Sequence, residues 1–60
     1  MNIAEVKTEL DKINKEIVSL EKYLEKIEDE GNYDLEVYKN IDKLECRREE
    51  LEQIIFEGGV

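Results

Sequence analysis

The chain has 60 residues, of which 43% are charged and 40% are hydrophobic, and its formal net charge is −8. This length allows one small domain, residues 1–60, and excludes a second domain. With one cysteine, Cys46, and no histidine, the chain cannot form an intrachain disulfide and is a poor candidate for a zinc site. Regular helix packing and self-association remain as sources of stability.

The first predicted helix covers about residues 2–30. Its hydrophobic residues follow one another at alternating steps of three and four, which is the a/d stripe of a coiled coil sustained over about four heptads. The stripe consists of Ile3, Val6, Leu10, Ile13, Ile17, Leu20, Leu24 and Ile27. This pattern is the strongest structural signal in the sequence, and it predicts a long helix with one apolar seam.

After this stripe comes an acidic segment with the features of a tight turn. Gly31 suits the left-handed position that follows the end of a helix. Asp34 suits the N-cap of the next helix, with Asn32 as the alternative cap. Tyr33 and Tyr38 are spaced to pack across that N-terminus as a hydrophobic staple. The segment therefore predicts a break between two helices.

The second predicted helix covers about residues 35–57, after a turn at 31–34 and before a tail at 58–60. Its seam repeats the steps of four and three with one exception, an arginine. The seam residues are Val37, Ile41, Leu44, Arg48, Leu51 and Ile55. The sequence thus predicts two helices whose apolar stripes can face each other.

A turn this short forces the two helices to run antiparallel, so the numbers of facing residues add up to about 65. The predicted layers are Leu24 with Ile41, Leu20 with Leu44, Ile17 with Arg48, Ile13 with Leu51, and Leu10 with Ile55, while Ile3 and Val6 extend beyond the second helix. The predicted fold class is all-α: an antiparallel, coiled-coil-like two-helix hairpin that dimerises into a four-helix bundle.

Two helices that meet along one stripe leave other hydrophobic residues uncovered. These residues, with Arg48 from the seam, form the predicted interface: Val18, Tyr23, Leu35, Tyr38, Arg48, Ile54 and Phe56. A contiguous apolar patch marks an interface, whereas single exposed apolar residues are ordinary. Self-association and capture by a different protein are the two alternatives, and the first is preferred because a two-helix unit rarely holds itself together in water.

Arg48 has two interpretations. Its guanidinium pairs with a carboxylate at an interface, or its stem covers apolar neighbours while its head reaches water. Glu16 and Glu52 are the candidate partners. Cys46 lies off the seam among opposing charges, and we expect it to be an incidental free thiol because reactivity needs an electropositive setting.

The sequence predicts no catalytic residue, no cofactor, no metal and no small-molecule substrate. Ser19, the only serine, has no general base beside it other than ordinary surface acids, and there is no Gly-rich phosphate loop. The acidic turn lacks the alternating ligand spacing of a calcium loop. A hairpin also offers no concavity that would raise the pKa of a general acid.

Charge and hydropathy restrict the expected partners and location. The nine Lys and Arg residues are interleaved with 17 Asp and Glu residues, so direct nucleic-acid binding is not expected. No apolar run approaches the roughly 20 residues that cross a bilayer, and the N-terminus lacks a signal peptide pattern. With a single free cysteine, these features predict a cytoplasmic protein with no membrane contact.

The layout resembles the small aspartyl-phosphate phosphatases that oppose sporulation phosphorelays, which are helical hairpins of similar length. Residues 31–37, Gly-Asn-Tyr-Asp-Leu-Glu-Val, are similar to the turn of that family. The family's signature, Ser-Gln-Glu-Leu-Asp, would fall on residues 41–45, where only Leu44 matches outright, Glu45 stands in place of the aspartate and Ile41 replaces the polar start. The resemblance implies a phosphorylated response regulator as the partner.

Three functional hypotheses follow. The first is a non-catalytic interaction protein, a small acidic regulator, inhibitor or adaptor from a bacterium or phage, which docks its helical faces on a larger protein. The second is the phosphatase-type regulator of a response regulator. The third is a structural coiled-coil component of an assembly. The identity of the protein partner does not follow from the sequence.

Overall fold

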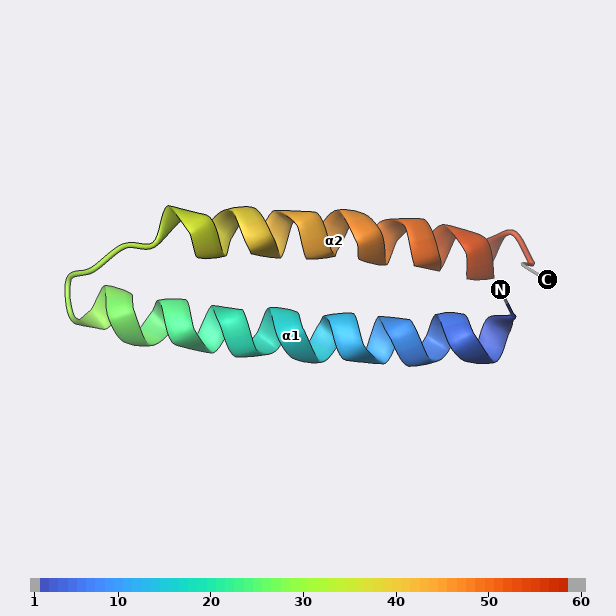
Figure 1. The fold of residues 1–60 in the computed structure, drawn as a ribbon, viewed down its shortest axis with the longest axis horizontal. Coiled ribbons are helices and arrows are strands. Elements are labelled where there is room, and N and C mark those ends of the chain that lie inside the picture. The colour runs from blue at the N-terminus through green and yellow to red at the C-terminus, as the bar shows by residue number, and fades with distance from the viewer. Residues whose placement is uncertain (1, 59–60) are drawn as a thin grey trace.

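The computed structural model describes residues 2–58, which form two antiparallel helices joined by a short turn (Figure 1). Helix α1 spans Ile3–Asp29 and helix α2 spans Leu35–Phe56. They lie side by side in a rod of 46 × 15 × 14 Å, with the start of α1 and the end of α2 at the same end. The all-α hairpin predicted from the two apolar stripes is confirmed, and no strand occurs between residues 2 and 58.

Each helix begins with a side-chain cap. The Oδ1 of Asn2 accepts a hydrogen bond from the backbone N–H of Glu5 at 2.8 Å, and the Oδ1 of Asp34 accepts one from Val37 at 3.3 Å. Each bond satisfies an N–H group that has no partner within the helix. The N-cap predicted at Asp34 is confirmed, so the alternative at Asn32 is wrong.

Helix α1 ends in a Schellman motif around Gly31, whose φ is 84°. The N–H of Gly31 donates to the carbonyl oxygen of Glu28 at 3.0 Å, and the N–H of Asn32 donates to that of Ile27 at 2.8 Å. These bonds use carbonyl groups that the helix end would otherwise leave unpaired. Glycine adopts this backbone conformation without steric cost, which explains why the chain reverses here.

The core is a single file of hydrophobic side chains between the helices. Its buried members are Val6, Ile13, Ile17, Leu24, Val37, Ile41 and Leu51. The residues partly buried around them are Leu10, Leu20, Ile27, Leu44, Ile54 and Ile55. Both members of two predicted layers, Leu24 with Ile41 and Ile13 with Leu51, are buried in this core. No polar or charged side chain in the described range is buried.

The predicted overhang of Val6 is wrong, although Ile3 is 37% exposed as expected. Val6 has no exposed surface. Ile54 and Ile55, in the last turn of α2, both pack against the core. The hydrophobic side chains at the end of α2 therefore cover α1 further toward its N-terminus than the predicted pairing of one residue per layer implied.

Replacing Ile41 by aspartate tests the seam. Ile41 is 8% exposed, so Ile41→Asp places an unpaired charge in the core and should cost about 3 kcal/mol or more of unfolding free energy. Far-UV circular dichroism should show loss of the helical signal. The matched variant Lys39→Asp, at an exposed position of α2, should remain helical. Ile41→Asp with unchanged helicity and melting would show that the seam is not the core.

Replacing Gly31 tests the turn. Apart from Gly31 and its two chain neighbours, nothing lies within 4 Å of the position that a Cβ would take, so the cost of Gly31→Ala comes from the positive φ. We expect a loss of about 1 kcal/mol in denaturant unfolding. A synthetic chain with D-alanine at position 31 is the control, because its preferred φ is positive, and it should recover most of that loss. Equal losses from L- and D-alanine would contradict this account.

Candidate interaction surfaces

The seam has two edges, along which the side chains that flank the core reach solvent. Residues on either side of an a/d stripe project toward opposite edges of a helix pair. A shallow groove lined by both helices lies along each edge. We refer to these surfaces as the acidic edge and the neutral edge, because their charged residues differ.

The acidic edge is built around a groove whose hydrophobic floor is flanked by glutamates. The groove is lined by Glu21, Leu24, Glu25, Glu28, Tyr38, Ile41 and Glu45. Helical spacing adds further acids to the same side, namely Asp11, Asp42, Glu49 and Glu52. The only basic residues that this spacing places there are Lys7 and Arg48. Most of the net negative charge therefore belongs to one edge of the hairpin.

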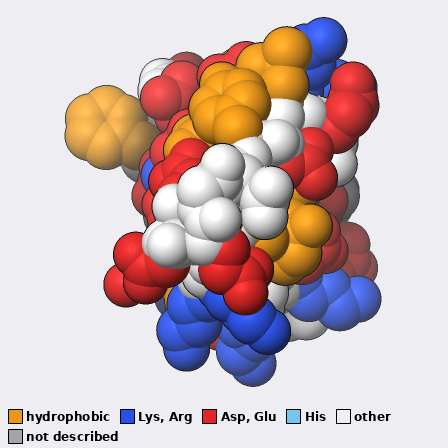
Figure 2. Space-filling view, turned by 90° about the vertical axis from the view of Figure 1, so that its left-hand side faces the viewer, with side chains coloured by type: hydrophobic (Ala, Val, Ile, Leu, Met, Phe, Trp, Pro, Cys, Tyr) orange, Lys and Arg blue, Asp and Glu red, His pale blue; other side chains and the backbone are white. Residues whose placement is uncertain are grey.

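Exposed hydrophobic side chains lie among these acids. Val18 is 48% exposed, Leu35 52%, Tyr38 38% and Phe56 87%. Figure 2, which looks onto the turn end, shows hydrophobic side chains near acidic ones in its upper part and most Lys and Arg side chains along the lower border, on the side of α1. The acidic edge thus combines negative charge with apolar contact area.

Tyr38 connects the two helices at the turn end of the acidic edge. Its hydroxyl donates a hydrogen bond to the Glu28 carboxylate on α1. Its ring stacks on that of Tyr33 with 5.3 Å between centroids, which confirms the predicted staple. The hydrogen bond to Glu28 raises the pKa of Tyr38, because the carboxylate stabilises the protonated hydroxyl.

Arg48 crosses the seam toward the acidic edge. Its Nη1 donates to the Oδ1 of Asn14 at 3.1 Å, and its Nη2 lies 3.7 Å from the Glu45 carboxylate. The predicted partners, Glu16 and Glu52, are therefore wrong. Glu16 lines the groove of the other edge, and helical side chains lean toward the N-terminus of their own helix, so Arg48 approaches Glu45 rather than Glu52.

The neutral edge has a groove with a more balanced charge, and helical spacing adds to the same side both acids and bases, namely Glu5, Glu9, Glu30, Glu36 and Glu50 with Lys12, Lys26 and Arg47. The edge as a whole is therefore less acidic than the other. The groove is lined by Lys15, Glu16, Ser19, Leu20, Asn40, Lys43 and Leu44. Leu20 and Leu44 are only partly buried. Tyr23, which is 46% exposed, and Ile27 follow Leu20 along the same edge at helical spacing. This edge therefore presents an apolar strip between opposite charges.

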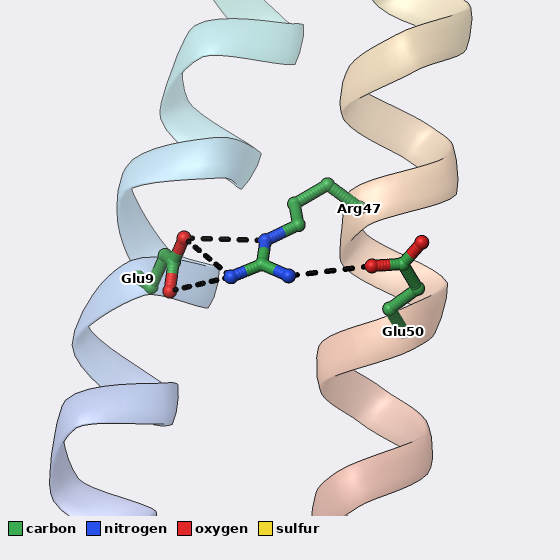
Figure 3. A network of polar contacts seen from close by, with 3 residues as sticks. All are labelled: Glu9, Arg47 and Glu50. Carbon is green, nitrogen blue, oxygen red and sulfur yellow. Dashed lines mark hydrogen bonds and ion pairs between the residues drawn. The ribbon is translucent and has the colours of Figure 1, made fainter. Parts of the chain in front are cut away.

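An ion-pair network crosses the helices near the open end of the neutral edge (Figure 3). The Nε and Nη2 of Arg47 lie 3.3 and 3.2 Å from the Oε1 of Glu9, and its Nη1 lies 3.3 Å from the Oε2 of Glu50. Hydrogen bonds to Glu9 and Glu50 raise the pKa of Arg47 further. The Arg47 and Glu9 side chains are 42% and 35% exposed, so solvent screens this pair and its contribution to stability is small.

Sequence reasoning missed the Glu9–Arg47 pair. The residue numbers of Glu9 and Arg47 do not add up to about 65, as those of a predicted layer do. The long arginine side chain reaches across more than one layer. The available signal was their heptad position. The steps along the two stripes make Ile3 and Ile41 a positions, so Glu9 and Arg47 are both g residues, and g residues of antiparallel helices lie along the same edge. Their opposite charges help to define the register of the hairpin.

The residues predicted as one interface are divided between the two edges. Val18, Leu35, Tyr38, Arg48 and Phe56 lie on the side of the acidic edge, and Tyr23 and Ile54 lie on the neutral edge. Ile54 is partly buried against the core. Leu35 and Phe56 lie at opposite ends of α2, about 30 Å apart at the rise of an α-helix. The seven residues therefore do not form one continuous patch.

Other kinds of site find little support in the geometry. Within residues 2–58, no group of three His, Cys, Asp or Glu side chains is arranged to hold a metal ion. Neither helix of this part of the chain is long and apolar enough to cross a bilayer. Cys46 is exposed and unpaired with another cysteine. The two edges are the candidate functional surfaces because they combine charged side chains with exposed hydrophobic ones.

The Tyr38–Glu28 bond makes a pH-dependent prediction. Because the folded pKa of Tyr38 is raised, the unfolded chain releases this proton first as the pH rises above the ordinary value of 10.0. The bond's contribution to stability is therefore complete below that pH and is lost as the pH rises through the raised pKa. Urea unfolding over this range should show the decline, and both Tyr38→Phe and Glu28→Gln should reduce its slope. An unchanged slope in both variants would contradict the assignment.

Comparison with known proteins gives no relative from which a function could be inferred. The chain matches no family model, no curated protein and no solved structure. The similarity to sporulation-type phosphatases therefore remains one of layout and turn residues. A functional conclusion has to come from the two edges themselves.

Proposed function

We propose that the protein is a non-catalytic interaction module, a small acidic regulator that docks its acidic edge on a larger basic protein and so inhibits or adapts it. The observation that carries this proposal is the concentration of acids on one edge, beside exposed Val18, Leu35, Tyr38 and Phe56. The same surface offers ion pairing and apolar burial along a rigid helix pair.

The chemistry of this edge defines the partner. A basic amphipathic helix supplies Lys or Arg side chains for the groove glutamates and apolar side chains for Tyr38 and the hydrophobic floor. Charge complementarity would speed association and select against acidic partners. No buried titratable group lies in the described range, so the surface favours binding over acid–base catalysis.

A synthetic Lys/Leu amphipathic peptide serves as a defined probe for this edge. Glu21→Gln/Glu25→Gln removes two charges from the groove, and neither residue forms an ion pair in the described part of the chain. By calorimetry, we expect peptide binding to weaken about fivefold or more and to fall with added salt. The matched control is Glu16→Gln/Glu30→Gln, which has the same net charge and should bind nearly as wild type.

Equal weakening by both double variants would show that binding follows net charge and not the acidic edge. Absence of peptide binding at low salt would contradict the proposal outright. A phosphorylated receiver domain belongs in the same panel: loss of its phosphate on addition of the protein would instead support the phosphatase hypothesis.

A further inference from the structure

We propose that the neutral edge is the surface on which a second copy of this chain packs, so that two hairpins form a four-helix bundle and leave their acidic edges outward. The inference concerns the edge opposite to the one in the proposed function. Its failure would therefore leave the docking of a basic partner untouched, and the reverse also holds.

The exposed area of the hairpin is the first argument. The chain exposes 4595 Å², compared with about 4,100 Å² expected for a compact monomer of its mass. One face of a rod 46 Å long and 15 Å wide covers about 700 Å² in projection, close to the roughly 800 Å² per partner of a standard interface. One edge is thus large enough for a stable dimer.

Hydrophobic residues on the neutral edge are the second argument. Leu20 and Leu44 belong to the seam but are only partly buried, and Tyr23 beside them is 46% exposed. In a four-helix bundle, seam positions of this kind complete their burial against the facing pair of helices. A second hairpin on this edge therefore buries side chains that a lone hairpin leaves at the surface.

Charge selects this edge over the other. Two acidic edges packed together would bring the groove glutamates against one another, and this repulsion between like charges disfavours the contact. On the neutral edge, Lys15 and Lys43 lie around the same groove as Glu16. Two copies of this edge therefore bring together a mixture of acids and bases, with less repulsion than two acidic edges would have. A surface that tolerates its own copy in this way suits the two-fold symmetry of a homodimer.

Sedimentation equilibrium on the full chain tests the inference. The wild type should form a dimer, and its dissociation constant should fall as salt rises, because screening weakens the repulsion between two chains of charge −8. Ser19→Lys/Asn40→Lys adds two like charges to the groove at exposed positions and should raise the dissociation constant about tenfold or more.

The matched control is Thr8→Lys/Gln53→Lys, at exposed positions on the outermost faces of the helices. It has the same net charge as the groove variant and should dimerise at least as well as wild type. Tyr23→Ser, which removes apolar area from the same edge at an exposed position, should also weaken the dimer without loss of helicity.

Three results would overturn the inference. A wild-type monomer at all practical concentrations excludes the dimer. Equal dissociation constants for the groove variant and its control would place the contact elsewhere. A dimer that weakens with salt would show that opposite charges hold the chains together, contrary to an apolar contact between two acidic molecules.

Discussion

Everything in this hairpin depends on one file of hydrophobic side chains shared by two helices. Each helix alone would expose its apolar stripe, and isolated helices draw little stability from propensity in water. Packing Val6, Ile13, Ile17 and Leu24 against Val37, Ile41 and Leu51 provides the burial that makes both helices persist. The Schellman motif at Gly31 lets the chain reverse direction, so that residues of one chain form both sides of this file of side chains.

A core one file wide has a direct consequence for function. Between residues 2 and 58, side chains next to the file lie on an edge, and no polar or charged side chain is buried. The functional surfaces proposed for this chain are therefore its two edges. The difference between those surfaces is electrostatic: glutamates surround Leu24 and Ile41 on one edge, whereas Lys15, Lys43 and Glu16 surround Leu20 and Leu44 on the other.

The two proposals use this difference in opposite ways. An acidic edge that repels its own copy remains free for a basic partner, and a neutral edge that tolerates its own copy can hold a dimer. The Glu9–Arg47 pair lies on the neutral edge, and the Tyr38–Glu28 and Arg48–Asn14 bonds lie on the acidic edge, so both edges have polar bonds between the helices. These bonds are exposed and contribute little energy, but they help to hold the register in which the grooves form.

The sequence by itself determined the two helices, the turn at Gly31 and the residues of the seam, because these depend on local periodicity and backbone preference, whereas it left Asp34 and Asn32 as alternative caps. Only the tertiary structure decided that Val6 is buried, that Arg48 binds Asn14 and Glu45, and that Arg47 reaches Glu9. The burial of Val6 depends on how far α2 covers α1, and the arginine contacts depend on the reach and lean of long side chains between the helices, which heptad position alone does not determine.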